Sequence, residues 1–303
     1  MDEAMAVLRA AVLQCFPDWR ADEVSLTPLD GGITNRNAIV SVASLAPRRF
    51  VARLPGERTE LLGIDRANEA EAARRAAALG IGPPVIGALE PIGTLVTELV
   101  PGEHLETAQF VARLDEVVGL ITRFHEGGRL RGAFPIHRVV EWHGRDAVAH
   151  GGTLPDAYAQ LHDVSVRIER AFAADPDPPV ACHNDLLPAN VLFSVDRAWL
   201  LDFEYAGVND RYFDLANLSI NCGLGTDAER RLLELYFGDV TDRALARLAL
   251  MKVMSEFREG MWAVVQQVIS TLDTDFAGYA DTRLASALTL VESIDLRATL
   301  AAS

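Results

Sequence analysis

A polar loop near residue 185 carries an aspartate and an asparagine at a spacing that suits phosphoryl transfer. The loop, residues 182–190, reads Cys-His-Asn-Asp-Leu-Leu-Pro-Ala-Asn. Asp185 can accept the proton of an attacking hydroxyl, and Asn190 offers a neutral oxygen to Mg²⁺. Asp202, at the end of the next apolar run, can supply the anionic ligand that joins the metal to phosphates. We therefore predict Asp185, Asn190 and Asp202 as the catalytic residues, with Asn190 and Asp202 as the metal ligands.

The specificity of this pattern comes from the segment that follows it. A bare His-x-Asp-x₄-Asn arises by chance in on the order of one chain in a hundred of this length. An Asp-Phe-Glu at residues 202–204, reached through two short strand-like runs, makes the pattern much more specific. The alternative, that these polar residues only hold a turn together, is disfavoured by the combination.

A glycine pair between two strand-like runs is the second feature that suits a nucleotide. Gly31 and Gly32 allow backbone N–H groups to approach phosphates closely, and Thr34 and Asn35 can add donors. Two glycines at a hairpin are also typical of an ordinary tight turn. The position of the pair, one strand before a basic residue and a helix, favours the phosphate-binding interpretation.

The basic residue is Arg53, which lies between apolar neighbours in the run 50–54. An arginine in the middle of a strand needs an anionic partner. The candidates are the phosphates of ATP and Glu69 on the following helix, with Glu71 as the competitor of Glu69. The alternative is an arginine at a strand edge that reaches solvent.

A short hinge is predicted at residues 98–102, which end in Pro-Gly. Apolar side chains around residues 94–98 predict a dry slot for adenine beside this hinge. Glu98 and Val100 are the nucleotide contacts that we expect there.

Strand-like and helical runs divide the chain unevenly. Up to about residue 100, periodicity and turn signals predict helices at 3–14 and 64–79 and strands at 24–29, 37–43, 49–54, 84–87 and 94–100. Beyond that point the pattern is mainly helical, apart from a loop between short strand-like runs at 178–202. We predict an α+β fold of two lobes, with a nucleotide-binding N-lobe at residues 1–100. The C-lobe, residues 101–303, is expected to carry the catalytic loop and the acceptor pocket, and a cleft between lobes suits a ligand.

Composition excludes several classes of function. The chain has 303 residues, half of them hydrophobic, and 28 basic against 43 acidic residues give a formal net charge of −15. That charge argues against nucleic acid, whose phosphates need a basic face. It is compatible with a cationic small substrate, but solubility is the more common reason for an acidic surface. No apolar run reaches the roughly 20 residues of a membrane span, and the acidic start lacks the basic region of a secretory signal. Three scattered cysteines favour neither a disulfide framework nor a zinc site. We expect a cytoplasmic protein, of which the sequence indicates no oligomeric state.

Three motifs together resemble those of a known family. The His-Asn-Asp-x₄-Asn at 183–190, the Asp-Phe-Glu-Tyr at 202–205 and the Gly-Gly-x-Thr-Asn-Arg-Asn at 31–37 are similar to those of the choline/ethanolamine kinases. This family lies within the aminoglycoside-phosphotransferase-like group, and the similarity runs from about residue 26 to residue 283. The resemblance implies a two-lobed protein-kinase-like fold with ATP and Mg²⁺ as cofactors. It also implies that Arg53 pairs with Glu69.

The C-terminal part carries the signal for the acceptor. Residues 257–280 resemble the helices that supply aromatic walls around a trimethylammonium group in choline kinases, and Trp262 and Tyr279 fall on matching positions. Glu259 stands where eukaryotic members carry a second tryptophan. Glu204 and Tyr205, after Asp-Phe, are expected at the rim of the same pocket, together with Glu259. The resemblance therefore implies choline as the small-molecule acceptor. The alternative for the two aromatic residues is ordinary packing between helices.

Several other functions are compatible with part of this pattern. The same phosphoryl transfer could use another acceptor: ethanolamine, thiamine, an aminoglycoside or a sugar. A protein kinase is disfavoured, because only a short segment separates Asp202 from the next apolar helix and Glu204 stands where protein kinases have glycine. A nucleotide-binding pseudokinase that serves as an interaction module has no need of Asp185, Asn190 and Asp202 together. We therefore predict an ATP-dependent small-molecule kinase.

Overall fold

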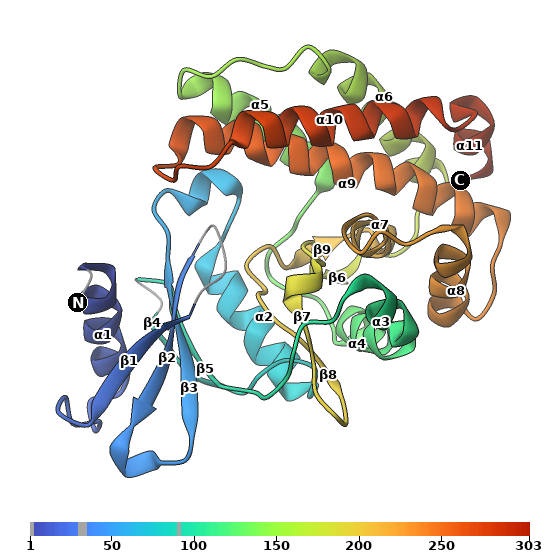
Figure 1. The fold of residues 1–303 in the computed structure, drawn as a ribbon. Coiled ribbons are helices and arrows are strands. Elements are labelled where there is room, and N and C mark those ends of the chain that lie inside the picture. Colours follow the sequence, from blue (N-terminus) through green and yellow to red (C-terminus); the bar gives the residue numbers. More distant parts are fainter. Residues whose placement is uncertain (1–2, 30–34, 90–91) are drawn as a thin grey trace.

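A five-stranded antiparallel sheet forms the N-terminal part of the computed structural model, which describes residues 3–29, 35–89 and 92–303 (Figure 1). The order of its strands is β1-β2-β3-β5-β4. Their bounds are β1 (Val24–Leu29), β2 (Asn35–Val42), β3 (Arg49–Pro55), β4 (Val85–Leu89) and β5 (Thr94–Glu98). The strands predicted from the sequence are confirmed, with ends that differ by a few residues.

One face of the sheet packs on helix α1 (Glu3–Cys15). Alternate side chains of the strands, such as Val40 and Ala52, are fully buried in a core with Leu8 of this helix. Because successive side chains of a strand point to opposite faces, the intervening residues face away from α1. Ile39, Val51 and Thr97 are such residues, and the strand register places them side by side.

Helix α2 (Arg66–Ala78) lies between the sheet and the C-terminal part (Figure 1). Asp65 caps it by accepting the backbone N–H groups of Ala67 and Asn68 at 2.9 and 3.2 Å. Ala72, Ala73 and Ala76 belong to the large core of the C-terminal helices, and Asn68 accepts the backbone N–H of Gly132 at 2.9 Å. The packing of α2 therefore crosses the lobe boundary that we propose between residues 100 and 101.

The C-terminal part is mainly helical, as the sequence predicts. Its helices are α3 (Thr107–Ala112), α4 (Leu114–Glu126), α5 (Ile136–Ala149), α6 (Tyr158–Ala174), α7 (Arg211–Asn221), α8 (Thr226–Phe237), α9 (Asp242–Ile269), α10 (Phe276–Glu292) and α11 (Leu296–Ala302). Two short antiparallel pairs complete it: β6 (Val180–Cys182) with β9 (Gly207–Asn209), and β7 (Val191–Phe193) with β8 (Ala198–Leu200). Short 3₁₀ turns lie at η1 (Ala43–Leu45), η2 (Thr59–Leu62) and η3 (Pro188–Asn190).

Helix α9 is the central element of this part, and it packs against α5, α7 and α10. It is buried on all sides from Val253 to Gln266, so its charged residues there need partners inside the protein. None of the helices in the described residues is both long and apolar enough to cross a membrane.

Candidate active site

The catalytic loop connects β6 to β7 and brings two of the predicted residues into contact. The amide nitrogen of Asn190 donates to the backbone oxygen of Asp185 at 2.8 Å and to its carboxylate at 3.2 Å. Asp202 follows β8, and the backbone N–H of its neighbour Leu201 donates to the backbone oxygen of Asn190 at 2.9 Å. The structure thus joins the segments of Asp185, Asn190 and Asp202. The hydrogen bonds to Asp185 use the amide nitrogen of Asn190, and its amide oxygen suits a hard metal ion.

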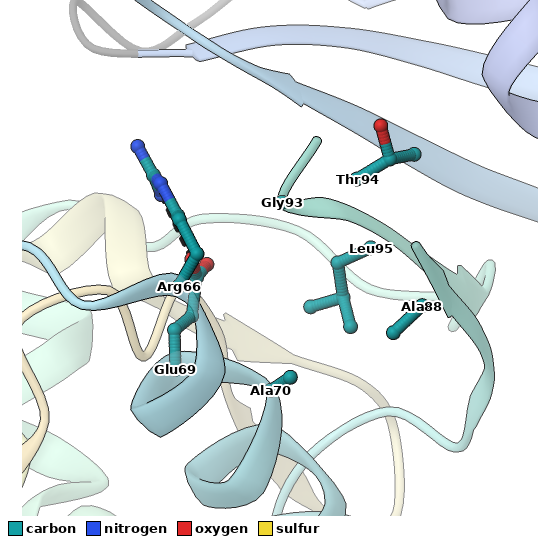
Figure 2. Close-up of a pocket in the computed structure, with 7 residues that line it drawn as sticks. All are labelled: Arg66, Glu69, Ala70, Ala88, Gly93, Thr94 and Leu95. Atoms are coloured by element: carbon teal, nitrogen blue, oxygen red, sulfur yellow. Dashed lines mark hydrogen bonds and ion pairs between the residues drawn. The ribbon is translucent and has the colours of Figure 1, made fainter. Parts of the chain in front are cut away.

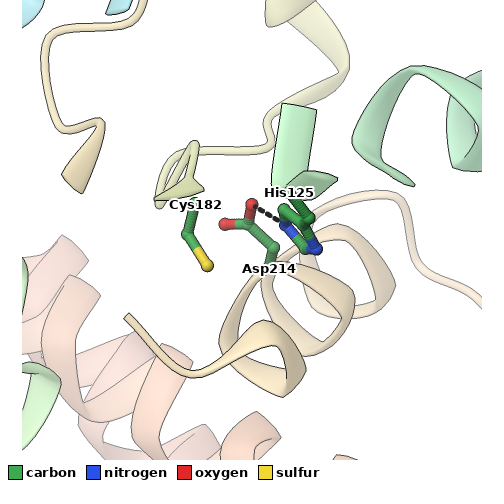
Figure 3. A group of neighbouring side chains, drawn as sticks. All are labelled: His125, Cys182 and Asp214. Atoms are coloured by element: carbon green, nitrogen blue, oxygen red, sulfur yellow. Dashed lines mark hydrogen bonds and ion pairs between the residues drawn. The ribbon is translucent and has the colours of Figure 1, made fainter. Parts of the chain in front are cut away.

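Asp214 on α7 anchors this loop. Its carboxylate accepts the backbone N–H groups of His183 and Asn184, each at 2.7 Å, and Nε2 of His125 lies 2.9 Å from it (Figure 3). Asn184 adopts a positive φ of 65°, which is uncommon for a residue other than glycine. Two charge-assisted hydrogen bonds to a buried carboxylate fix the backbone that precedes Asp185.

The same carboxylate lies close to a cysteine in an arrangement that resembles a metal site. Ligand atoms of His125, Cys182 and Asp214 lie within 4.8 Å of one another (Figure 3). Their polar atoms already have partners, since His125 Nδ1 contacts the hydroxyl of Tyr236 at 2.7 Å and Cys182 donates to the backbone oxygen of Asp210 at 3.6 Å. Burial also raises the pKa of the Cys182 thiol well above its usual value, which disfavours the thiolate that a metal needs. The cluster supports the loop.

The carboxyl group of Asp185 is buried in a low-dielectric environment. This burial raises its pKa to about 8, and the nearby Arg258 guanidinium counteracts the rise. Nη1 of Arg258 lies 3.5 Å from Oδ1 of Asp185. A basic carboxylate beside a fixed cation suits the acceptance of a proton from a hydroxyl.

Arg53 on β3 pairs with two carboxylates on different elements. One nitrogen of its guanidinium contacts Glu69 on α2, and another donates to Asp202. Glu71, the competitor considered from the sequence, instead pairs with Arg75 at 2.9 Å. Arg53 is only 8% exposed, so its charge is held inside the cleft next to a predicted metal ligand.

Arg66, the first residue of α2, holds a second network across the lobes. It donates to Glu69 at 2.8 Å and to Glu204 at 3.2 Å, and Asn35 donates to the same oxygen of Glu204 at 2.9 Å. Figure 2 shows Arg66 and Glu69 on one side of the helix, opposite Thr94 and neighbouring strand residues. The structure therefore places Asn35 and Glu204 together, where the sequence predicts a phosphate contact and an acceptor contact. Burial raises the pKa of Glu204.

The nucleotide side of the cleft is described in part. Gly31, Gly32 and Thr34 lie outside the described residues, and Asn35 is the first described residue after them. At the hinge, Glu98 pairs with Arg48 through its side chain.

A pocket borders the hinge, lined by Pro47, Arg48, Arg49, Glu98, Leu99, Val100, Pro101 and Gly102. On the sheet, Ile39, Val51 and Thr97 form a row of half-buried side chains that faces away from α1. A mostly apolar row beside a hinge suits the flat, weakly polar adenine ring.

The predicted acceptor residues meet at the contact between α9 and α10. Nε1 of Trp262 donates to the hydroxyl of Tyr205 at 2.9 Å, and the rings of Trp262 and Tyr279 lie 6.2 Å apart at 72°. The hydroxyl of Tyr279 donates to Glu259 at 3.3 Å. Four of the residues predicted around the acceptor, Tyr205, Glu259, Trp262 and Tyr279, are thus in one cluster, whereas Glu204 lies with Arg66.

Three residues of the site were not predicted from the sequence. Asp214 anchors the catalytic loop, Arg66 joins the lobes, and Arg258 links the predicted base to the acceptor cluster. A usable signal existed for two of them. Asp214 and Arg258 are charged residues inside apolar helical segments, and such residues are retained only with partners.

Most of the chain matches a known protein family. The phosphotransferase enzyme family matches residues 25–250. The chain belongs to this family. The phosphotransferase is 27% identical to ethanolamine kinase 2 of Mus musculus over 87% of its own length and 75% of the mouse protein. It is 26% identical to protein LicA of Haemophilus influenzae, over 87% of its own length and 79% of that protein.

The solved structures agree with the sequence relatives. A choline/ethanolamine kinase family protein from Mesorhizobium loti is 28% identical, with a TM-score of 0.82 over 99% of this chain and 98% of that one. The predicted two-lobed, protein-kinase-like α+β fold is thereby confirmed. The phosphotransferase is an ATP-dependent small-molecule kinase, as the motifs predict.

Proposed function

We propose that this kinase transfers the γ-phosphate of ATP to the hydroxyl of a small amino alcohol of the choline/ethanolamine type. The observation that carries the proposal is the link between the predicted base and the acceptor cluster. Arg258 contacts both the carboxylate of Asp185 and that of Glu259. A hydroxyl at Asp185 is therefore next to Tyr205, Glu259 and Trp262. The names of the relatives, an ethanolamine kinase and a choline/ethanolamine kinase family protein, support the same acceptor class.

Mg²⁺ is the metal that the donor set fits best. Asn190 offers a neutral amide oxygen, and Asp202 offers a carboxylate whose side chain is 31% exposed. Hard oxygen donors with room for phosphate oxygens are what Mg²⁺ prefers. When bound, the metal supplies neutralisation of the charge that develops on the transferred group.

The roles of the protein side chains follow from their positions. Arg53 places positive charge beside Asp202, where we expect the phosphates of ATP. The backbone of Gly31 and Gly32 and the side chain of Thr34 are expected to bind the same phosphates. Glu98 and Val100 hold the adenine at the hinge. Glu69 keeps the guanidinium of Arg53 in place.

Asp185 orients the acceptor hydroxyl and accepts its proton as the phosphate is transferred. Its position is fixed by Asn190 on one side and by Arg258 on the other. The amine end of the acceptor then lies among Tyr205, Glu259, Trp262 and Tyr279. The sequence predicts choline there, and the carboxylate of Glu259 also suits an amine that donates N–H groups.

The test is ATP consumption by the purified protein with choline, ethanolamine, thiamine, an aminoglycoside and a sugar as separate acceptors. We expect phosphorylation of an amino alcohol at a kcat/KM at least about tenfold above that of the other classes. The Asp185→Asn variant serves as the background. Turnover that is restricted to thiamine, an aminoglycoside or a sugar contradicts the proposed acceptor class and leaves the kinase assignment intact.

A further inference from the structure

Arg258 is an unusual residue for the place it occupies. It lies in the middle of α9, is 1% exposed, and has Phe257 and Met261 as buried neighbours on the helix. Moving a guanidinium out of water is costly unless partners compensate it. Inside the protein it pairs with Glu259 and lies 3.5 Å from Asp185. Because burial of a guanidinium is unfavourable, the position of Arg258 beside the predicted base indicates a role in the reaction.

The guanidinium also covers an aromatic face of the acceptor cluster. Its central carbon lies 4.3 Å from the ring centroid of Tyr205. The second tyrosine of the cluster has the same kind of neighbour, since the guanidinium carbon of Arg283 lies 5.0 Å from the ring centroid of Tyr279. A quaternary ammonium has no hydrogen to donate, so a site for it depends on such ring faces. Here the chain's own cations occupy them.

We infer that Arg258 determines the acceptor selectivity of the kinase by occupying the position over Tyr205 that a quaternary ammonium requires. The inference rests on the proposed amino-alcohol function and narrows it to amines that keep N–H groups. Choline, expected from the sequence, then becomes a poor acceptor, and a primary amine such as ethanolamine a good one.

Hydrogen bonding favours a primary amine as well. One oxygen of Glu259, Oε1, is already paired with Arg258. Among the described residues, its second oxygen, Oε2, accepts a single hydrogen bond, of 3.3 Å, from Tyr279. A primary ammonium can donate an N–H to this oxygen, whereas each added methyl group removes a donor and brings bulk toward Arg258.

The experiment compares ethanolamine, its N-methyl and N,N-dimethyl derivatives, and choline as acceptors. In the wild type, kcat/KM should fall along the series, by about tenfold or more from ethanolamine to choline. In Arg258→Gln, which removes the charge and keeps a donor for Glu259, the choline-to-ethanolamine ratio should rise about tenfold, the scale of one desolvated cation–π contact. Arg258→Lys keeps the charge and should keep the low ratio. Arg170→Gln, on the exposed side of α6, is the matched control.

Binding of tetramethylammonium, measured by calorimetry without ATP, separates this inference from the proposed function. Arg258→Gln should bind it about tenfold more tightly than the wild type. Equal affinities, or a wild type that uses choline as well as ethanolamine, overturn the inference. If no amino alcohol is phosphorylated, the proposed function fails, and the tetramethylammonium comparison still decides the role of Arg258. Should Arg258→Gln not fold, Arg258→Met combined with Glu259→Gln takes its place, and Glu259→Gln alone then replaces the wild type as the reference.

Discussion

Arg53 donates a hydrogen bond to the carboxylate of Asp202, which lies 149 residues further along the chain. The same guanidinium pairs with Glu69, so a strand, a helix and the segment after β8 are joined at one cation. Asp202 has a positive φ of 59°, a backbone conformation that is uncommon outside glycine. The cation expected to contact phosphate and the carboxylate expected to bind metal are thus in contact with each other.

Replacement of Arg53 should lower kcat, and the effect should be larger when the positive charge is removed than when it is kept. We expect Arg53→Ala to lower kcat by about 10²-fold and to raise the KM for ATP, because charge beside the phosphates is lost. Arg53→Lys should cost less, although it cannot contact Glu69 and Asp202 at once. Steady-state kinetics with ATP varied provides the measurement.

Exposed Arg20, which pairs with Asp22 on the surface, supplies the control, and Arg20→Ala should behave as the wild type. Unchanged kcat and KM for ATP in Arg53→Ala would show that the phosphates lie elsewhere.

Asn190 and Asp202 should determine the requirement for Mg²⁺. Asn190→Ala removes the amide oxygen and Asp202→Ala removes the carboxylate, so each should raise the Mg²⁺ concentration for half-maximal rate at least tenfold or abolish turnover. A titration of Mg²⁺ at fixed ATP measures this. Wild-type metal dependence and rate in both variants would place the metal site away from these residues.

The replacement of Asp185 by asparagine should lower kcat while the protein remains folded and binds ATP. Asp185→Asn is expected to lower kcat by at least about 10²-fold, since a positioned base contributes that much or more. ATP binding should persist, because the fold and the residues of the nucleotide site are untouched. Near-normal turnover would exclude Asp185 as the base.

The same variant should be more stable than the wild type in the absence of ligands, with a difference that depends on pH. Burial raises the pKa of Asp185 to about 8, above the value of about 3.9 in an unfolded chain. Between these values the native state binds more protons than the unfolded state, so the stability of the wild type falls as pH rises through this window. We expect the Tm advantage of Asp185→Asn to be larger at pH 8 than at pH 5. Asp281→Asn, at an exposed position of α10, should show no such trend.

The sequence was sufficient where the signal is local. Side-chain alternation predicts the strands of the sheet, because one face packs on α1 and Val40 and Ala52 are buried there. The spacing of Asp185 and Asn190 also has a local cause, since one 3₁₀ turn brings Asn190 back onto Asp185. Such features need no knowledge of distant contacts.

The rest of the site depends on contacts between distant segments. Periodicity on α2 did not decide between Glu69 and Glu71, and the answer comes from which of them faces β3. Asn35 and Glu204 are predicted on separate subsites, but a shared network with Arg66 brings them together. Long-range pairing of this kind is set by tertiary packing, which the pattern of a single segment does not encode.

Asp214 should stabilise the catalytic loop and thereby support turnover. Asp214→Asn retains one acceptor oxygen but turns an N–H group toward the backbone N–H of His183 or Asn184. An unsatisfied buried donor costs about 1–3 kcal/mol, so we expect a loss of this size in the free energy of unfolding, together with a lower kcat. Urea unfolding and steady-state kinetics measure the two effects. A chelator should leave the Tm unchanged; a fall in Tm on chelation would instead indicate a metal held by His125, Cys182 and Asp214.

Trp262 provides the last prediction, because it contacts two other residues of the acceptor cluster. Its ring lies 6.2 Å from that of Tyr279, and its Nε1 donates to the hydroxyl of Tyr205 at 2.9 Å. Trp262→Ala should raise the KM for the preferred amino alcohol roughly two- to thirtyfold, the range of one aromatic contact with a cation. The KM for ATP should change little. Trp262→Phe keeps a smaller aromatic ring and loses the hydrogen bond to Tyr205, so its KM should lie between those of the wild type and the alanine variant. An equal rise in the KM values for ATP and acceptor would mean that Trp262 supports the packing of α9 and α10 and forms no wall of the acceptor site.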